Sequence, residues 1–381
     1  MQRVINVIDI GSRNICALIG RKGINNSLNV KIFTSEQYDG YSNGEFFCLS
    51  NLKMAISEAV NRIETTTKRP FIRSFVGIPA EFCVIKSATA QLTFDRPKLI
   101  TDSVISELCD IALGSIQHTL NNLTLINRAP ISFVTEAGKK VTSAKGLRAR
   151  VISAHLSFAF IKKDLKADLT KILKAVGLID VDFVCTPLAQ AMYLLNPEIR
   201  KADNILIDVG YISTSVAWTS GEGICQLFAF SLGGGHISGD LCECLKIRYR
   251  DAETLKSSII LSVDKSESDV YNIDSGIKTL PISAKAAHDI CKARIEDIAK
   301  NVSIAINSFN KNFPKTQEVF LAGEGILSVT GGKDYLSKCL GRPVIAVTAS
   351  SPMPGETKHS SILSILNFAI IVSELDKKRW W

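Results

Sequence analysis

The sequence predicts an α/β fold built from two domains, and three observations support this. The chain has 381 residues, more than one compact core usually takes and enough for two. Strand-like and helix-like patterns alternate along it. The opening segment 7–11 (VIDIG) has a counterpart at 206–210 (LIDVG) in the second half. The repeat divides the chain into a first domain at 1–197 and a second at 198–381.

The first half shows both periodicities. Runs of β-branched or alternating residues predict strands at 3–10, 15–20, 29–34, 74–95, 131–136, 147–160 and 179–184. Apolar residues at helical spacing predict helices at 50–65, 102–113, 165–176 and 187–195. Thr101 or Asp102 is the expected N-cap of the second of these helices.

The second half repeats the opening order. Strands are predicted at 205–210, 213–219, 224–231 and 319–321, and helices within 240–260, 285–310 and 360–373. No low-complexity linker separates the halves. We therefore expect two closely coupled domains.

Composition excludes several classes of protein. The ten cysteines are scattered without a C-x-x-C, so reduced thiols are expected rather than a disulfide framework or a zinc site. No signal peptide and no apolar run of about 20 residues is present, which predicts a cytoplasmic protein. Net charge is +8, but Lys and Arg are spread along the chain, so no nucleic-acid partner is expected.

The repeated motif has a chemical meaning. In each copy a buried strand ends in an aspartate, Asp9 or Asp208, and a glycine, Gly11 or Gly210, then permits a tight hairpin. Two such hairpins facing each other would surround phosphates with backbone N–H groups, and the two carboxylates would hold a hydrated divalent cation. One Asp-x-Gly is weak evidence, because both residues are common in turns. Two copies, each opening a domain-sized half, favour a nucleotide site.

Two further segments fit the same pocket. In 319–325 (VFLAGEG) a strand runs into a turn whose Gly323 and Gly325 would let the backbone approach a base or ribose. In 251–256 (DAETLK), Glu253 and Lys256 share one face of a helix. Taken alone, such a pair is more often a solvated ion pair.

The order of these motifs is that of the actin, sugar-kinase and chaperone-ATPase superfamily, and within it the chain resembles the bacterial cell-division family FtsA over nearly its whole length. Four segments support this resemblance: the first phosphate loop, a Gly-Gly stretch, the helix whose Glu and Lys approach the nucleoside, and an Ala-Arg-Ile-Glu segment. They lie at 9–14 (DIGSRN), 231–240 (SLGGGHISGD), 251–256 (DAETLK) and 292–297 (KARIED).

The resemblance implies an actin-like (ribonuclease H-like) two-domain fold with an FtsA-type 1C subdomain at about 74–158. It also implies a 2B-like helical part at about 240–300 that binds FtsZ. The expected function is an ATP-binding scaffold that polymerises and links FtsZ filaments to the inner membrane at the division site, from its cytoplasmic face. Other division proteins would bind the 1C-like subdomain. Any ATPase activity would be weak.

The resemblance and the motifs together name the residues expected to bind ATP or ADP: Asp9, Gly11, Ser12, Arg13, Asn14, Asp208, Gly210, Ser213, Thr214, Gly234, Glu253, Lys256, Gly323 and Gly325. Asp9 and Asp208 are expected to hold Mg²⁺ through water. No catalytic residue is predicted.

The chain departs from the family pattern around the phosphates. Asn14 stands where Lys is usual, Tyr211 and Ile212 replace two glycines of the second loop, and Ser215 replaces its final aspartate. Glu324 replaces a third glycine. Losing two charge-assisted hydrogen bonds of ~1.5–3 kcal/mol each would lower affinity roughly 10²- to 10⁴-fold. β-Branched Ile212 also resists a positive φ.

ATP hydrolysis is less expected than ATP binding. Actin-like ATPases often place a water-orienting Glu or Gln before the proline of the segment that is 186–190 (TPLAQ) here. Gln190 does not occupy that position.

The C-terminal residues Lys377, Lys378, Arg379, Trp380 and Trp381 combine cations with interfacial aromatics. They predict a peripheral contact with the inner membrane. At ~1 kcal/mol per cation the attraction is marginal for one subunit, and a filament would multiply it. A frayed basic tail is the alternative.

Other functions remain open. A sugar kinase would need a catalytic aspartate near 75–110, but Asp95 and Asp102 suit a turn and a helix cap. A pilus-assembly platform of the PilM type shares the fold and a 1C-like insertion. A scaffold that works without nucleotide is the third alternative.

Overall fold

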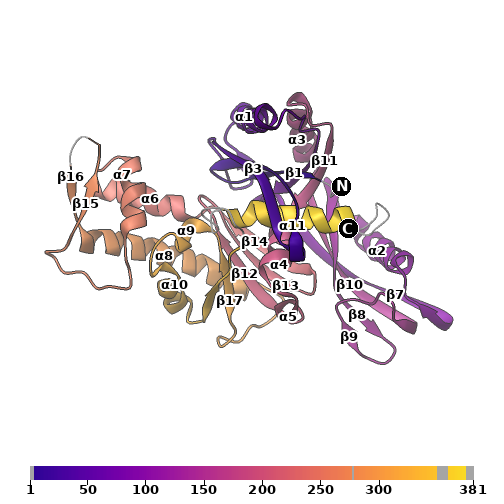
Figure 1. The fold of residues 1–381 in the computed structure, drawn as a ribbon. Coiled ribbons are helices and arrows are strands. Elements are labelled where there is room, and N and C mark those ends of the chain that lie inside the picture. The colour runs from indigo at the N-terminus through magenta and orange to yellow at the C-terminus, as the bar shows by residue number, and fades with distance from the viewer. Residues whose placement is uncertain (1–3, 277–278, 350–358, 375–381) are drawn as a thin grey trace.

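The computed structural model describes residues 4–276, 279–349 and 359–374. Two five-stranded sheets form the middle of an elongated molecule, with an additional part at each end (Figure 1). The C-terminal helix crosses the centre, between the sheets.

The first sheet has the strand order β11-β6-β1-β2-β3. Its strands are β1 Ile5–Ile10, β2 Asn14–Lys22, β3 Leu28–Gln37, β6 Arg73–Ile78 and β11 Asp180–Cys185. The first three form antiparallel hairpins, and β6 runs parallel to β1 and to β11. The helices that pack on this sheet are α1 Leu49–Thr67, α3 Lys163–Ala175, α4 Thr186–Leu194 and α11 Ser360–Glu374.

The second sheet repeats this topology with the order β14-β13-β12-β17-β18. Its strands are β12 Asn204–Val209, β13 Thr214–Ser220, β14 Gly223–Phe230, β17 Val319–Ala322 and β18 Val344–Ala346. The first three are antiparallel, and β17 is parallel to β12 and β18. One face packs on α6 Gly234–Leu245, α8 Ala284–Asn307 and α10 Gly332–Leu340.

An inserted subdomain lies between β6 and β11. Its four-stranded sheet has the order β7-β10-β8-β9 and packs on one helix. The elements are β7 Val84–Leu99, α2 Asp102–Ile116, β8 Leu123–Thr135, β9 Lys140–Val141 and β10 Arg148–Lys162. The 1C-like insertion was predicted from residue 74, whereas β6 belongs to the first sheet. The expected cap Thr101 is the N-cap of α2, but its hydroxyl bonds Ser103 instead of the helix backbone.

The opposite end carries α7 Tyr249–Ser258 and a hairpin of β15 Val270–Asp274 and β16 Thr279–Ser283. The 2B-like part at about 240–300, which was predicted to be helical, therefore also contains two strands. Shorter elements complete the chain: β4 Tyr41–Ser42, β5 Glu45–Phe46, α5 Pro197–Arg200, α9 Glu324–Leu327 and 3₁₀ turns at Ile24–Asn26, Ala80–Phe82 and Gln117–Thr119.

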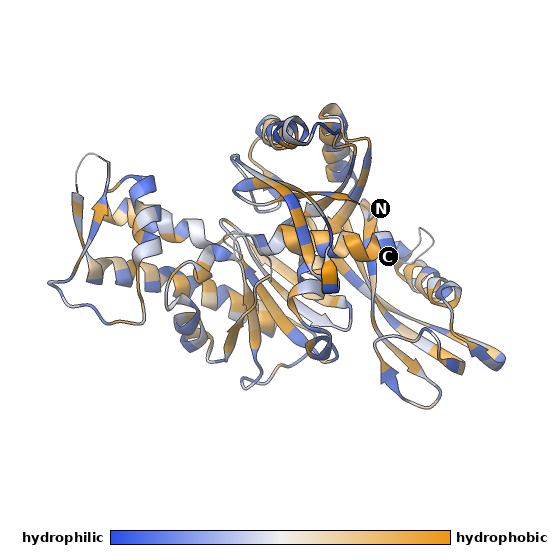
Figure 2. Cartoon of the chain, in the orientation of Figure 1, coloured by the Kyte–Doolittle hydropathy of each residue, from blue (hydrophilic) through white to orange (hydrophobic). Residues whose placement is uncertain are grey.

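Helix α11, the last element of the described residues, packs on the first sheet. It is apolar on several sides (Figure 2) and packs against β1, β2, β6 and α4. Leu366 lies against Gly20, where a Cβ would come within 2.5 Å of its side chain. The second domain was predicted to run to residue 381, whereas this helix packs on the first sheet.

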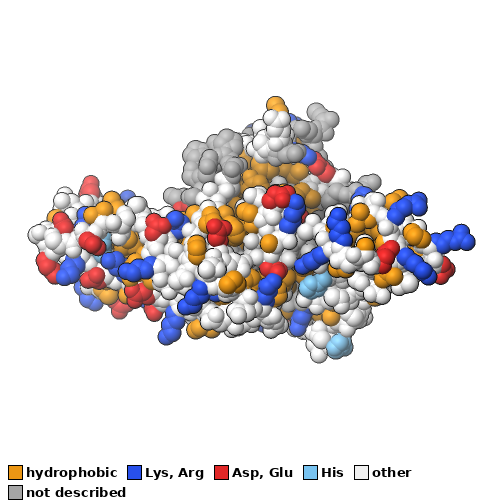
Figure 3. All heavy atoms as spheres, turned by 90° about the horizontal axis from the view of Figure 1, so that it is seen from below, with side chains coloured by type: hydrophobic (Ala, Val, Ile, Leu, Met, Phe, Trp, Pro, Cys, Tyr) orange, Lys and Arg blue, Asp and Glu red, His pale blue; other side chains and the backbone are white. Residues whose placement is uncertain are grey.

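The surface seen in Figure 3 mixes both charges along the molecule, and basic side chains gather at the end formed by the inserted sheet. Within the described ranges, no helix combines the length and the apolarity that a membrane span requires. The predicted membrane-contact residues Lys377, Lys378, Arg379, Trp380 and Trp381 lie outside the described residues.

Candidate functional site

A cavity of about 570 Å³ lies where the two Asp-x-Gly hairpins meet. Of the residues predicted to bind nucleotide, all except Thr214 line it: Asp9, Gly11, Ser12, Arg13, Asn14, Asp208, Gly210, Ser213, Gly234, Glu253, Lys256, Gly323 and Gly325. Thr214 is fully buried, and its hydroxyl donates to the carbonyl of Leu232. Four segments that are far apart in the sequence thus converge on one space.

The topology explains the position of the two aspartates. Asp9 and Asp208 are the last residues but one of β1 and β12, and each strand is the middle one of its sheet. Burial raises the pKa of Asp9 to about 7; a hydrogen bond from Ser361 opposes this rise, and the Asp208 charge adds to it. Burial also raises the pKa of Asp208, against a 2.8 Å hydrogen bond from Gln190 Nε2.

Two buried carboxyl groups with raised pKa values favour a shared proton or a bound cation. Two other oxygens that line the cavity, Thr186 Oγ1 and Asn14 Oδ1, are buried without a hydrogen-bond partner among the described atoms. This donor set fits a hydrated Mg²⁺, since hard cations prefer oxygen ligands.

The two loops form the same turn. The Gly11 N–H donates to the Asn14 carbonyl at 3.0 Å, and the Gly210 N–H donates to the Ser213 carbonyl at 2.9 Å. The loops are also joined, because the Ile212 N–H donates to Ser12 Oγ at 3.0 Å.

The predicted conflict at Ile212 does not arise. Among the described residues, positive φ outside glycine occurs at Asn25, Asn43, Lys68, Asn122 and Lys246. Because the second loop closes without a positive φ at Ile212, its β-branched side chain brings no backbone strain.

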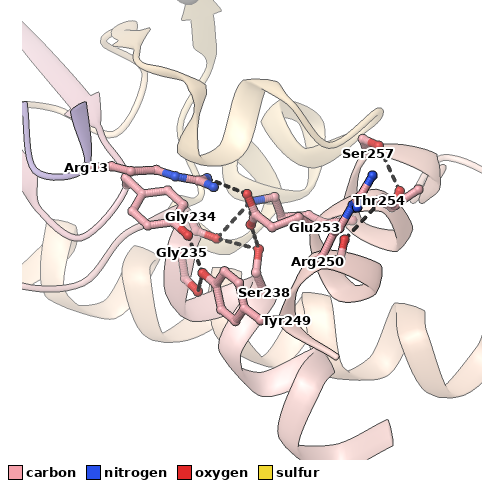
Figure 4. Close-up of polar contacts among 11 residues, drawn as sticks. Arg13, Gly234, Gly235, Ser238, Tyr249, Arg250, Glu253, Thr254 and Ser257 are labelled. Carbon is pink, nitrogen blue, oxygen red and sulfur yellow. Dashed lines mark hydrogen bonds and ion pairs between the residues drawn. The ribbon is translucent and has the colours of Figure 1, made fainter. Parts of the chain in front are cut away.

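An ion pair spans the cleft between the domains (Figure 4). Arg13 Nη1, on the turn after β1, lies 2.6 Å from Glu253 Oε2 on α7. The Arg13 guanidinium also lies over the ring of Tyr211, 4.3 Å from its centroid. The Tyr211 hydroxyl is hydrogen-bonded to that of Tyr249, which also donates to the Gly235 carbonyl at 3.2 Å.

Glu253 has several partners on its own domain. It accepts a hydrogen bond from Ser238 and lies 3.0 Å from Lys256 Nζ. Burial works to raise the pKa of Glu253, but the Ser238 hydrogen bond, Lys256 and Arg13 hold it below its ordinary value. Glu253 is therefore ionised at neutral pH and shared by two cations.

The third turn packs on the second loop. Gly323 has φ +86°, and a Cβ there would lie 2.3 Å from Asp208 Oδ1. A Cβ on Gly325 would lie 2.4 Å from the Gly210 carbonyl. These glycines allow the loops to touch. Glu324, which also lines the cavity, has a buried Oε1 without a hydrogen-bond partner among the described atoms.

The sequence did not indicate Ser238, Tyr249 or Ser361 as residues of this site, and it suggested the segment with Thr186 and Gln190 only for orienting an attacking water. Gln190 lies one helical turn after Thr186 on α4, which was a signal that both face the cavity. Tyr211 was noted only as a lost glycine.

The sequence is similar to curated cell-division proteins. It is 23% identical over 374 residues to FtsA of Staphylococcus epidermidis, covering 97% of this chain and 79% of the relative. It is 19% identical over 307 residues to FtsA of Bacillus subtilis, covering 79% and 69%. No protein-family model matches the chain. The predicted resemblance to FtsA is confirmed, and the low identity makes this chain a divergent relative.

The fold is similar to those of solved actin-like proteins. The PilM–PilN type IV pilus biogenesis complex gives a TM-score of 0.64 at 13% identity, covering 97% of this chain and 99% of that chain. MreB5 of Spiroplasma citri bound to AMPPNP gives 0.56 at 12% identity, covering 99% and 98%. The predicted actin-like two-domain fold is confirmed.

Proposed function

We propose that this chain is a cell-division scaffold of the FtsA type that binds ATP or ADP with Mg²⁺ at reduced affinity. The observation that supports this most is the convergence of both Asp-x-Gly hairpins, Glu253, Lys256 and the third turn on one cavity. This arrangement occurs in a chain that is similar to FtsA over 97% of its length.

Different residues of the cavity would bind the metal ion, the phosphates and the nucleoside. Asp9 and Asp208 would hold Mg²⁺ through water, and the turns at Gly11 and Gly210 would face the phosphates. The bound ion would neutralise phosphate charge next to two carboxylates. Glu253 and Lys256 would approach the nucleoside.

We propose that the chain binds ATP but does not hydrolyse it efficiently. Gln190 donates to Asp208 from within a buried helix and is 2% exposed. A side chain held in this way is not available to orient an attacking water.

Calorimetric titration with MgATP tests the nucleotide proposal. We expect binding by the full chain that Asp208→Ala abolishes and Asp95→Ala preserves, since Asp95 is exposed on β7 outside the cavity. Equal binding by both variants would contradict the assignment of Asp208. No binding by the unaltered chain would leave a scaffold that works through protein contacts alone.

The proposed partners follow from the relatives. We propose FtsZ as a partner of the end formed by α7, β15 and β16, other division proteins at the inserted sheet, and self-association into filaments. We place the protein at the cytoplasmic face of the inner membrane at the division site, with Lys377 to Trp381 as a peripheral contact. Co-sedimentation with FtsZ filaments, and with vesicles with and without anionic lipid, tests these contacts.

A pilus-assembly platform is the second candidate function. It is favoured by the TM-score of 0.64 to the PilM–PilN complex over 97% of this chain. Pulldown with FtsZ, beside pulldown with the N-terminal peptide of a PilN-type membrane protein, separates the two candidates. Capture of FtsZ alone supports the division scaffold, and capture of the peptide alone supports the platform.

A further inference from the structure

We propose that Tyr211 lowers the affinity of the cleft for a nucleotide, because its ring stands among the predicted nucleotide-binding groups that line the cavity. The choice of ligand rests on the proposed function. The position of the Tyr211 ring rests on its contacts with Arg13, Lys256 and Tyr249.

Tyr211 is surrounded by groups expected to hold the nucleotide. The Arg13 guanidinium lies 4.3 Å and Lys256 Nζ 5.9 Å from its ring centroid. A Cβ on Gly235, at the start of α6, would lie 2.9 Å from Cε1 of the ring. The Tyr249 hydroxyl bonds the far end of the same ring. Both cations therefore face an aromatic ring, which attracts them as a cation–π partner.

The backbone donors beside Tyr211 are also occupied. The Ile212 N–H donates to Ser12 Oγ at 3.0 Å. At the start of α6, the Gly234 N–H donates to the Gly210 carbonyl at 2.9 Å and the Gly235 N–H to the Tyr211 carbonyl at 2.6 Å. A phosphate at any of these positions would have to replace a protein acceptor that is already in place.

The cations of the cleft, like its backbone donors, already have protein partners. Arg13 and Lys256, the two cations that line the cavity, both pair with Glu253. The Arg13–Glu253 pair is partly buried, with side chains 32% and 22% exposed. An incoming nucleotide that uses either cation competes with Glu253 for it, and the carboxylate remains nearby as a repelling charge.

These contacts form a clasp, defined here as Arg13, Tyr211, Tyr249 and Glu253. Arg13 belongs to the first domain, and the other three residues belong to the second. The clasp therefore fastens the domains with protein groups at the position where a nucleotide would join them. A glycine at 211, as in the usual family pattern, leaves no ring for Arg13 to cover.

The test is Tyr211→Gly in the full chain, titrated with MgATP and with its fluorescent N-methylanthraniloyl derivative. We expect affinity at least about tenfold tighter than that of the unaltered chain, a change of about 1.4 kcal/mol. Tyr211→Phe is the matched control, because it keeps the ring and removes only the hydroxyl. It should bind like the unaltered chain. Equal affinity of all three proteins, or an equal gain in both variants, overturns the proposal.

A ligand-free measurement separates this proposal from the proposed function. Hydrogen–deuterium exchange at 234–236, beside the ring, should be faster in Tyr211→Gly and unchanged in Tyr211→Phe, which loses only the hydrogen bond to Tyr249. If this difference appears while no protein binds MgATP, the clasp stands and the nucleotide proposal fails. If the unaltered chain binds MgATP and neither affinity nor exchange changes, the clasp fails alone. Tyr211→Ala replaces the glycine variant if the latter does not fold, and the same outcomes apply.

Discussion

Two aspartates that the motif places near strand ends line the same cavity in the folded chain. Asp9 and Asp208 come from different domains, and burial raises the pKa of both. Each has one stabilising neighbour, Ser361 for Asp9 and Gln190 for Asp208. The two carboxyl groups favour a bound cation or a retained proton, because the charge on Asp208 raises the pKa of Asp9.

We predict that Asp9→Asn changes the pH dependence of stability. The folded chain retains the Asp9 proton up to about pH 7, whereas the unfolded chain loses it near 3.8. The contribution of Asp9 to the free energy of unfolding should therefore fall as pH rises from about 4 to about 7 and stay level above it. Asp9→Asn should reduce this fall, by a few kcal/mol at most, because one pKa unit corresponds to about 1.4 kcal/mol.

Urea unfolding at pH 5 and at pH 8 measures the effect of Asp9→Asn. The variant should gain stability over the unaltered chain mainly at pH 8. Asp95→Asn, on the exposed part of β7, is the control and should change neither value. A gain of equal size at both pH values would show that the Asp9 proton is not responsible.

Gln190→Ala should destabilise the protein. Gln190 is 2% exposed and its amide donates to the carboxyl group of Asp208, so its loss leaves Asp208 with one partner fewer. We expect a loss of about 1–3 kcal/mol in the free energy of unfolding from urea titrations. Gln117→Ala, at an exposed 3₁₀ turn, should stay within about 0.5 kcal/mol. A cost as small for Gln190 as for Gln117 would show that the buried contact contributes nothing.

Among the elements, the repeated strand–hairpin unit explains most of the architecture. Each copy gives three antiparallel strands followed by parallel neighbours, so the two sheets have equivalent orders. The inserted subdomain joins the second sheet where the turn after β13 meets β8. There the Glu222 N–H donates to the Pro130 carbonyl at 2.9 Å, and the neighbouring Gly221 has φ +60°.

Gly221→Ala should weaken this junction. A Cβ at Gly221 would lie 2.1 Å from the Ile131 carbonyl oxygen, so β8 would have to move. Gly138 offers a matched control, since it also has a positive φ, +71°, but no atom within 4 Å of the added Cβ. We expect a cost of about 1 kcal/mol for Gly138→Ala and roughly 3 kcal/mol for Gly221→Ala. Thermal and urea unfolding measure both, and equal costs would contradict the steric argument.

On the scale of the whole molecule, the two domains are joined by a second set of contacts besides the clasp. Glu81 accepts from the Gly44 N–H at 2.8 Å and from Ser231 at 3.0 Å, and Ser231 in turn accepts from the Asn43 N–H at 2.7 Å. The small β4–β5 hairpin is thereby tied to both domains. Opening the cleft requires these contacts to break as well.

Glu81→Ala should loosen the hairpin without unfolding the protein. Hydrogen bonds to a charged group contribute ~1.5–3 kcal/mol, so we expect amide exchange at 41–46 and 231–233 to be at least about tenfold faster. Glu45→Ala, exposed on the same hairpin, is the control and should leave exchange at 231–233 unchanged. Unchanged exchange in Glu81→Ala would show that the domains do not depend on this link.

Much of the fold and of the cavity lining was predictable because the sequence patterns that indicate them involve residues close together in the chain. The strand run before Asp9, the glycine after it and the second copy at Asp208 each depend on neighbours a few residues away. The weak elements were missed for the same reason. The β15–β16 hairpin and β18 are short, and their side chains carry little periodicity.

By itself, the sequence determined the α/β class, the two-fold repeat and the identity of most residues around the cavity, since these follow from strand periodicity and from turn chemistry. Only the tertiary structure decided that α11 packs on the first sheet, that Arg13 reaches Glu253 across 240 residues, and that the Arg13 guanidinium lies over the ring of Tyr211. The physical reason is that a side chain's direction across a cleft depends on how two separately folded sheets are placed. No pattern of neighbouring residues contains that placement.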